Sequence, residues 1–196
     1  VETAGRAWTA PETWPGSVAS GRGDGALRGL FAGGTLCDEA MIIAAETLGP
    51  IASNIPLDPA DALGPELASR GHTMIDFGDD DLTRGRPHPM IDGSLRVERM
   101  LAETADPGCG VLLLDVVLGL GADPDPAASL VEPVRAATAA GLPVVVAVVG
   151  TRDDPQDLAA TCAALHAAGA HVHLSNAAAT RAAVDLVAGT PRGAAS

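Results

Sequence analysis

The sequence predicts an α/β domain in which helices cover both faces of a doubly wound parallel sheet, and three observations support this. Short apolar segments alternate with helical segments from residue 26 onward, which is the pattern of strands joined by right-handed helical crossovers. Two apolar segments, residues 110–117 and 142–149, are almost continuously hydrophobic, as expected of strands buried on both faces of a parallel sheet. The 196 residues of the chain suffice for one such domain.

The first half of the domain starts with a short apolar strand over residues 27–32, which ends at two glycines. A helix over residues 35–46 follows the glycines, with acidic residues in its first turns, where the helix dipole stabilises them. Residues 49–71 contain several prolines and are expected to form a long excursion. The second strand, residues 72–77, leads into a polar loop over residues 78–89.

The second half continues this alternation of helices and strands. A helix over residues 92–104 is expected to expose Arg96, Glu98 and Arg99 to solvent. Strands over residues 110–117, 142–149 and 170–174 then alternate with helices over residues 127–140, 155–168 and 176–187. A serine or an asparagine at the start of the last helix provides its N-cap.

The predicted sheet has five strands in the flavodoxin-like order 2-1-3-4-5, in a three-layer α/β/α arrangement. Ligands of such sheets bind beyond the carboxyl ends of the strands, where the strand order reverses. In this order the reversal lies between the first and third strands. The loops over residues 32–38, 78–89 and 119–126 are therefore predicted to carry the site.

We expect the domain itself to span residues 26–188. Residues 1–25 are rich in Gly, Pro, Ala and Ser without sustained periodicity, which is typical of a flexible tail or linker. Residues 189–196 are expected to form a second tail. Trp8 and Trp14 are expected to dock on another surface, with a neighbouring domain as one candidate.

Composition limits the classes of function. The net charge of −13 argues against nucleic acid and anionic membranes as partners. No apolar run reaches the roughly 18 residues of a membrane span, and no secretory signal pattern is present. Three cysteines without metal-type spacing argue against a disulfide framework or a zinc site, so we expect a cytoplasmic protein. All 12 basic residues are arginine, which excludes lysine-based Schiff-base or Walker-A chemistry.

The turn Gly33-Gly34-Thr35 lies between the end of a strand and the start of a helix. Glycines allow close backbone approach, and the N–H groups of a helix start can bind a phosphate, phosphoryl or carboxylate group. The alternative is a tight turn that needs glycine only for steric reasons. Cys37 in the first turn of the helix is a nucleophile or, more commonly for such a position, a buried apolar residue. Glu39 orients a ligand or an arginine, or complements the helix dipole.

Residues 76–92 form the most distinctive segment of the chain. Three consecutive aspartates beginning at Asp79 repel one another, so they are expected to bind Mg²⁺ or to pair with Arg84 and Arg86. The two arginines are predicted anion ligands, because guanidinium groups bind such anions bidentately. His88, between two prolines, is predicted to act as base, phosphoryl acceptor or hydrogen-bond partner. The alternative is a solvated charged loop, and we assign no metal site.

Asp115 lies in the middle of an apolar strand, and Asp76 lies near the end of another. A carboxylate in a buried strand needs partners, so Asp115 is either a functional group or a structural anchor for the neighbouring loop. We expect Asp76, Asp79 and Asp115, together with Glu39, to support the anion site.

These segments resemble a known family. The resemblance is to the FdrA family, which is similar to succinyl-CoA synthetase and the NDP-forming acyl-CoA synthetases. It is carried by residues 30–41 (LFAGGTLCDEAM), 53–57 (SNIPL), 72–92 and 112–125, and the run GRPHPMID at residues 85–92 is its most specific part. It covers residues 26–187 and implies a CoA-ligase-type domain with a flavodoxin-like fold.

The resemblance also implies roles for individual residues. In the synthetases, such domains present a helix start to a phosphoryl group carried by a histidine. Gly33, Gly34 and Thr35 match that glycine turn, and Glu39 matches the acidic start of the helix. Residues 149–155 match the segment that carries the phosphohistidine in those enzymes but contain no histidine. CoA, ATP and Mg²⁺ are therefore expected to act through partner domains of the CoA-binding or ATP-grasp type.

Three functions are consistent with this sequence. The leading one is an FdrA-type, acyl-CoA synthetase-like domain that binds a small phosphate- or carboxylate-bearing substrate and acts with partner domains, with Arg86 and His88 as predicted catalytic residues. The second is a component of an oxamate-type carbamoyltransferase in purine or allantoin nitrogen catabolism. The third is a non-catalytic docking or regulatory module. A homodimer is a further possibility for each of them.

Overall fold

Six parallel strands form one sheet in the order β2-β3-β1-β4-β5-β6. The computed structural model describes residues 13–14 and 25–189. The strands are β1 (Ala26–Phe31), β2 (Ala52–Ser53), β3 (Thr73–Asp76), β4 (Cys109–Val117), β5 (Val144–Val149) and β6 (His171–His173). The helices are α1 (Gly34–Leu48), α2 (Asp80–Thr83), α3 (Ser94–Ala105), α4 (Pro126–Ala139), α5 (Leu158–Ala167) and α6 (Asn176–Ala188), with a 3₁₀ turn at Pro59–Asp61.

The predicted three-layer fold is confirmed, and the strand count is one higher than predicted. The five predicted strands correspond to β1, β3, β4, β5 and β6, and they lie in the predicted order. The additional strand, β2, lies within the excursion at residues 49–71 and pairs only through Ala52 and Ser53 with β3. Two residues are too few to show the alternation that identifies a strand.

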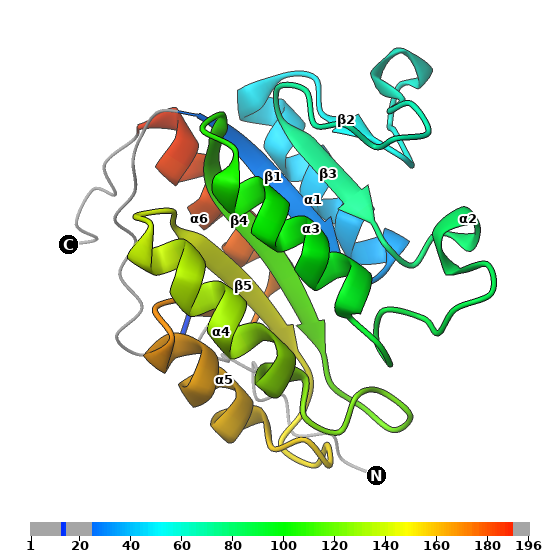
Figure 1. Ribbon diagram of the computed structural model, residues 1–196. Helices are drawn as coiled ribbons and strands as arrows, with labels where there is room; N and C mark the ends of the chain where they lie inside the picture. Colours follow the sequence, from blue (N-terminus) through cyan, green and yellow to red (C-terminus); the bar gives the residue numbers. More distant parts are fainter. Residues whose placement is uncertain (1–12, 15–24, 190–196) are drawn as a thin grey trace, which may run out of the picture.

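Helices cover the two faces of the sheet, with α3, α4 and α5 on one side and α1 and α6 on the other (Figure 1). The central strand β4 shows why the sequence requires both layers. Leu112 and Leu114 pack into the core between the sheet and helices α3, α4 and α5. Val111 and Leu113 pack into the core between the sheet and helices α1 and α6. A strand that buries alternate residues on opposite faces must be apolar throughout.

Residues 13 and 14, which precede β1 in the chain, contact strand β6. Thr13 forms an antiparallel bridge with His173, and the Trp14 amide donates a hydrogen bond to the Val172 carbonyl at 2.9 Å. Trp14 packs against the domain's own core. Trp8 and most of the expected tails lie outside the described residues. No helix in the described ranges is long and apolar enough to cross a membrane.

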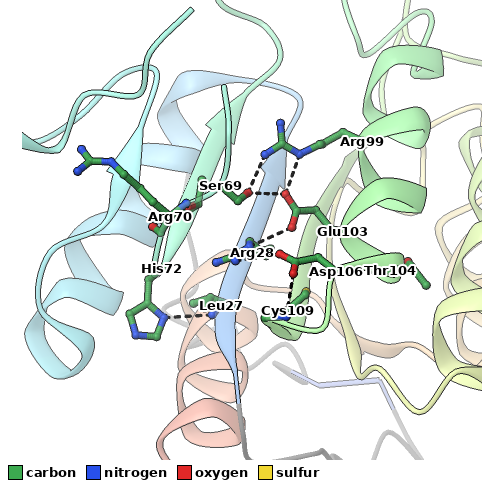
Figure 2. A network of polar contacts seen from close by, with 12 residues as sticks. Leu27, Arg28, Ser69, Arg70, His72, Arg99, Glu103, Thr104, Asp106 and Cys109 are labelled. Atoms are coloured by element: carbon green, nitrogen blue, oxygen red, sulfur yellow. Dashed lines mark hydrogen bonds and ion pairs between the residues drawn. The ribbon is translucent and has the colours of Figure 1, made fainter. Parts of the chain in front are cut away.

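A buried ion network ties β1 to α3 toward the amino ends of the strands (Figure 2). Glu103 accepts from Arg28 Nε at 3.0 Å, Arg99 Nε at 2.7 Å and the Ser69 hydroxyl at 2.5 Å. Arg28 also donates to Asp106 at 3.3 Å and to the carbonyl of residue 71. The network holds the end of the 49–71 excursion against α3.

Candidate functional site

The carboxyl ends of β3, β1 and β4 meet where the strand order reverses, and helix α1 starts at this edge. Its N-cap residue, Gly33, has no side chain to accept from the first-turn N–H groups. In contrast, Asp125, Asp157 and Ser175 cap helices α4, α5 and α6 with side-chain hydrogen bonds. The first turn of α1 therefore offers N–H donors that could bind an anion.

Limited space, and not backbone strain, explains the glycine at position 34, whereas position 33 has room for a side chain. The φ angle of Gly33 is −169°, which any residue adopts. A Cβ on Gly34 would lie 3.2 Å from Asp76 Oδ2, and a Cβ on Gly33 would lie 3.6 Å from Met90 Cε. Glycine at position 34 thus lets the Asp76 carboxyl group approach the helix start closely.

Asp76 places its carboxyl group beside this helix start. The residue is 5% exposed, and its Oδ1 accepts from the Gly78 amide at 2.7 Å. Burial raises the pKa of Asp76 above its ordinary value; the Gly78 N–H opposes this, and the charges of Asp79 and Asp115 add to it. A carboxyl group of this kind takes up a proton more readily than one in water.

His88 lies on the other side of Gly78 from the same carboxyl group. Its Nδ1 accepts from the Met90 amide at 3.2 Å, so in the neutral ring Nε2 carries the hydrogen. A Cβ on Gly78 would lie 2.8 Å from His88 Nε2 and 3.0 Å from Asp76 Oδ1. The predicted residues His88 and Asp76 are therefore brought together, with Gly78 giving the room between them.

The segment around Met90 crosses the crevice between β1 and β4. The Asp123 amide, in the loop after β4, donates to the Met90 carbonyl at 2.7 Å. Met90 and Pro89 also bound a small hollow, about 20 Å³, together with Ala32 and Arg96. The distinctive 85–92 run thus covers the point where the strand order reverses.

Asp115 is fully buried on β4 and anchors the end of β1. Its Oδ1 accepts from the Ala32 amide at 2.8 Å and from Arg96 Nη1 at 2.6 Å. Burial raises the pKa of Asp115, and the Arg96 charge opposes the rise. Of the two roles considered for this carboxylate, the anchor for the neighbouring loop is the one that the contacts support.

Arg96 corrects the expectation that this side chain is exposed. Its relative exposure is 6%, and Nη1 donates both to the Asp115 carboxylate and, at 2.8 Å, to the Asp115 carbonyl. Arg99 is half-buried, whereas Glu98 is exposed as expected. Sequence reasoning assigned Arg96 to the solvent side because charged residues usually lie there. The signal that could have found it is Asp115, since a buried carboxylate needs a cationic partner and this chain has arginine but no lysine.

The two arginines predicted to bind the anion lie elsewhere in the loop. Arg84 is exposed and pairs with Asp81 at 2.7 Å. Arg86 is exposed and lines a separate cavity of about 270 Å³, bounded on its apolar side by Phe77, Leu82 and Leu95. Among the described residues, no hydrogen bond or ion pair joins either arginine to the glycine turn.

The remaining predicted residues have local structural roles as well. Glu39 accepts from the Asn176 side chain at 2.7 Å and so links α1 to α6. Asp79 caps the short helix α2 by accepting from the Asp81 amide at 2.9 Å, which explains part of the aspartate run. Thr35 is exposed at the start of α1. Cys37 is fully buried, and burial raises the pKa of its thiol well above its ordinary value, which opposes a nucleophilic role.

The aspartate-rich loop does not form a recognisable metal centre. Within the described ranges, no group of three or more His, Cys, Asp or Glu side chains is arranged to hold a metal ion.

The fold and this edge define a doubly wound α/β domain whose uncapped helix start, loop histidine and buried ion pair meet at the reversal of strand order. The family model described as CoA-ligase matches residues 30–186, and the chain belongs to the CoA-ligase family. It is similar to an uncharacterized protein of Escherichia coli (strain K12), YahF, with 48% identity over 113 residues. That alignment covers 58% of this chain and 22% of YahF. The narrower FdrA assignment stays a prediction.

Proposed function

We propose that this acyl-CoA synthetase-like domain, of the FdrA type, binds a small phosphate- or carboxylate-bearing ligand at the start of α1. The observation that carries the proposal is the uncapped helix start at the reversal of strand order in a CoA-ligase domain. Backbone N–H groups at such a start, together with the helix dipole, stabilise a negative charge. Gly33, Gly34 and Thr35 supply the N–H groups in this proposal.

His88 and Asp76 give this position proton-transfer capacity. In the neutral ring, His88 Nε2 carries a hydrogen beside the Asp76 carboxyl group. In its protonated form either group can donate a proton to the bound ligand, and in its deprotonated form it can accept one, whereas an ionised Asp76 opposes the charge of the anion. We propose His88 as the catalytic group, with Asp76 supporting it. Arg84 and Arg86, on the exposed loop, reach the ligand only after this loop rearranges.

We assign CoA, ATP and Mg²⁺ to partner domains. The cavity beside Arg86 is about 270 Å³, which is below the roughly 300–1,000 Å³ of pockets that enclose drug-sized ligands. CoA and ATP are larger than such ligands. The partners in this proposal are CoA-binding or ATP-grasp-type domains, which supply the activated group to this edge of the sheet.

A second candidate function is a component of a carbamoyltransferase. The observation in its favour is the loop after β5, where residues 149–155 contain no histidine. The Asp154 carboxylate accepts from the Thr151 amide at 2.5 Å and closes this loop on itself. Transfer from preformed carbamoyl phosphate needs no phosphohistidine, whereas the synthetase relay does.

A thermal-shift titration tests the proposal and separates the candidates. The chain is titrated with orthophosphate, succinate, carbamoyl phosphate, CoA and ATP with Mg²⁺, because a ligand of the folded state stabilises it by about 2.7 kcal/mol at a hundred times its Kd. Stabilisation by orthophosphate or succinate supports the anion site. Stabilisation by carbamoyl phosphate alone favours the transferase.

A matched pair of variants locates the site. Gly34→Asp adds a carboxylate at the helix start, next to Asp76, and is expected to abolish the ligand shift. Gly64→Asp makes the same change where a Cβ has no neighbour within 4 Å, and is expected to bind like the unmodified chain. Unchanged binding by Gly34→Asp refutes the site. No shift with any ligand, together with tight binding to a partner protein, favours the docking module.

A further inference from the structure

Two polar atoms buried beneath the glycine turn have no hydrogen-bond partner among the described residues. They are Arg96 Nε and Asp115 Oδ2. The two side chains contact each other through one atom on each side, Nη1 and Oδ1, instead of the two parallel bonds that an arginine and a carboxylate can form. A buried guanidinium N–H group without an acceptor costs stability, so a further acceptor for Arg96 Nε would be favourable.

The position of Arg96 is suited to an acceptor from outside the chain. Arg96 bounds the hollow of about 20 Å³, together with Ala32, Met90 and Asp123. This volume fits roughly one water-sized group, and an oxygen of a carboxylate or phosphoryl group is of that size. Ala32 directly precedes the glycine turn, so the hollow and the α1 start are next to each other.

This inference rests on the proposed function. We propose that Arg96 is the ligand-binding cation of this site, and that one unsubstituted oxygen of the anion enters the hollow and accepts from its guanidinium. The α1 N–H groups bind the other oxygens. Asp115 is a positioning residue, because its Oδ1 holds Nη1 in place while also holding the Ala32 amide.

Burial distinguishes Arg96 from the exposed arginines of the loop. Arg84 has a side chain that is 79% exposed and is paired with Asp81, so salt screens its charge. The Arg96 side chain is 7% exposed, so solvent and salt screen its charge much less. The ligand class that fits is a small acid or phosphate monoester with a free terminal oxo group.

The test measures the affinity of the full chain for orthophosphate, acetyl phosphate and succinate by calorimetric titration. Arg96→Lys keeps a cation beside Asp115 but lacks the planar fork, and is expected to bind roughly tenfold to a hundredfold more weakly. Arg96→Met/Asp115→Asn removes both charges together, leaves an oxygen acceptor for the Ala32 amide, and is expected to lose binding. Arg135→Met removes an exposed arginine that pairs with Glu132 on α4 and is expected to bind normally.

The outcomes separate this inference from the proposed function. If the unmodified chain binds and both Arg96 variants, shown to be folded by circular dichroism, bind equally well, then Arg96 is not a ligand-binding residue and the helix-start site stands. If no probe binds the unmodified chain, both proposals fail. An equal loss in the Arg135→Met control would show a general charge effect and would also overturn the role of Arg96.

Discussion

Helix α3 supplies arginines to two buried carboxylates toward opposite ends of the sheet, and the two ion pairs differ in completeness. At the amino end, Glu103 receives three donors, including Arg28 and Arg99 (Figure 2). At the carboxyl end, Asp115 Oδ2 and Arg96 Nε have no partner within the part of the chain that the structure describes. A fully satisfied buried network stabilises a fold, whereas a partly satisfied one costs stability and is typical of a functional site. This difference is the basis on which we propose a structural role for the amino end and ligand binding at the carboxyl end.

The largest expected loss of stability comes from breaking the ion network around Glu103. Glu103→Gln removes the central charge and leaves Arg28, whose side chain is 5% exposed, with the partly exposed Asp106 carboxylate at 3.3 Å as its remaining counter-charge. We expect the free energy of unfolding to fall by about 3–5 kcal/mol, measured by urea denaturation. Glu98→Gln, on the exposed side of the same helix, is expected to change it by about 0.5 kcal/mol or less. A small loss in Glu103→Gln would mean that the amino-end network is not structural.

A smaller loss of stability is expected from variants of the Arg96–Asp115 pair at the carboxyl end of the strands. Arg96→Met alone leaves the Asp115 carboxylate unpaired, with an expected loss of about 3 kcal/mol. Adding Asp115→Asn removes that charge, so the double variant is expected to recover to within about 1 kcal/mol of the unmodified chain. Urea denaturation of the three proteins measures the recovery. If the double variant stays as unstable as Arg96→Met, the ion pair is a structural element like that of Glu103, and the contrast between the two ends disappears.

The helix that joins the two ends also shows where sequence reasoning stops. Its buried positions are Arg96, Met100 and Glu103, at spacings of four and three residues, as on one face of a helix. Two of the three are charged, so hydrophobicity alone cannot identify this face. Their burial depends on partners from β1 and β4, which lie far away in the sequence.

For the strands and for the start of α1, the local sequence pattern was sufficient to predict the structure. Continuous apolar runs predicted β4 and β5, and the glycine pair correctly marked the start of α1. The direction of side chains in the 78–93 loop was not predictable, because a loop has no periodicity that relates one residue to the next. For this reason the sequence could place His88 and Arg86 in one segment, but not predict that His88 lies near Asp76 while Arg86 lines another cavity.

The smallest expected effect is on the pH dependence of the free energy of unfolding, which differs between the carboxyl and amino ends of the strands. Burial raises the pKa of Asp76 above 3.8, so its contribution to stability is fully present below pH 3.8 and is lost as pH rises through the folded pKa. Burial, followed by the Arg28 charge, lowers the pKa of His72 below 6.5. The contribution of His72 is therefore present above pH 6.5 and is lost as pH falls through its folded pKa.

Asp76→Asn and His72→Gln are thus expected to change the pH dependence in opposite directions. Asp76→Asn removes the loss of stability on raising pH, and it is also expected to strengthen anion binding at neutral pH, because it removes a negative charge beside the helix start. In the structure His72 Nδ1 accepts a hydrogen bond from the Leu27 amide at 3.1 Å. His72→Gln keeps an acceptor for this amide but removes the loss of stability on lowering pH. Urea denaturation between pH 3 and pH 8 measures both slopes. Weaker anion binding by Asp76→Asn would show that this carboxyl group acts as a proton donor to the ligand, and not as a charge that opposes it.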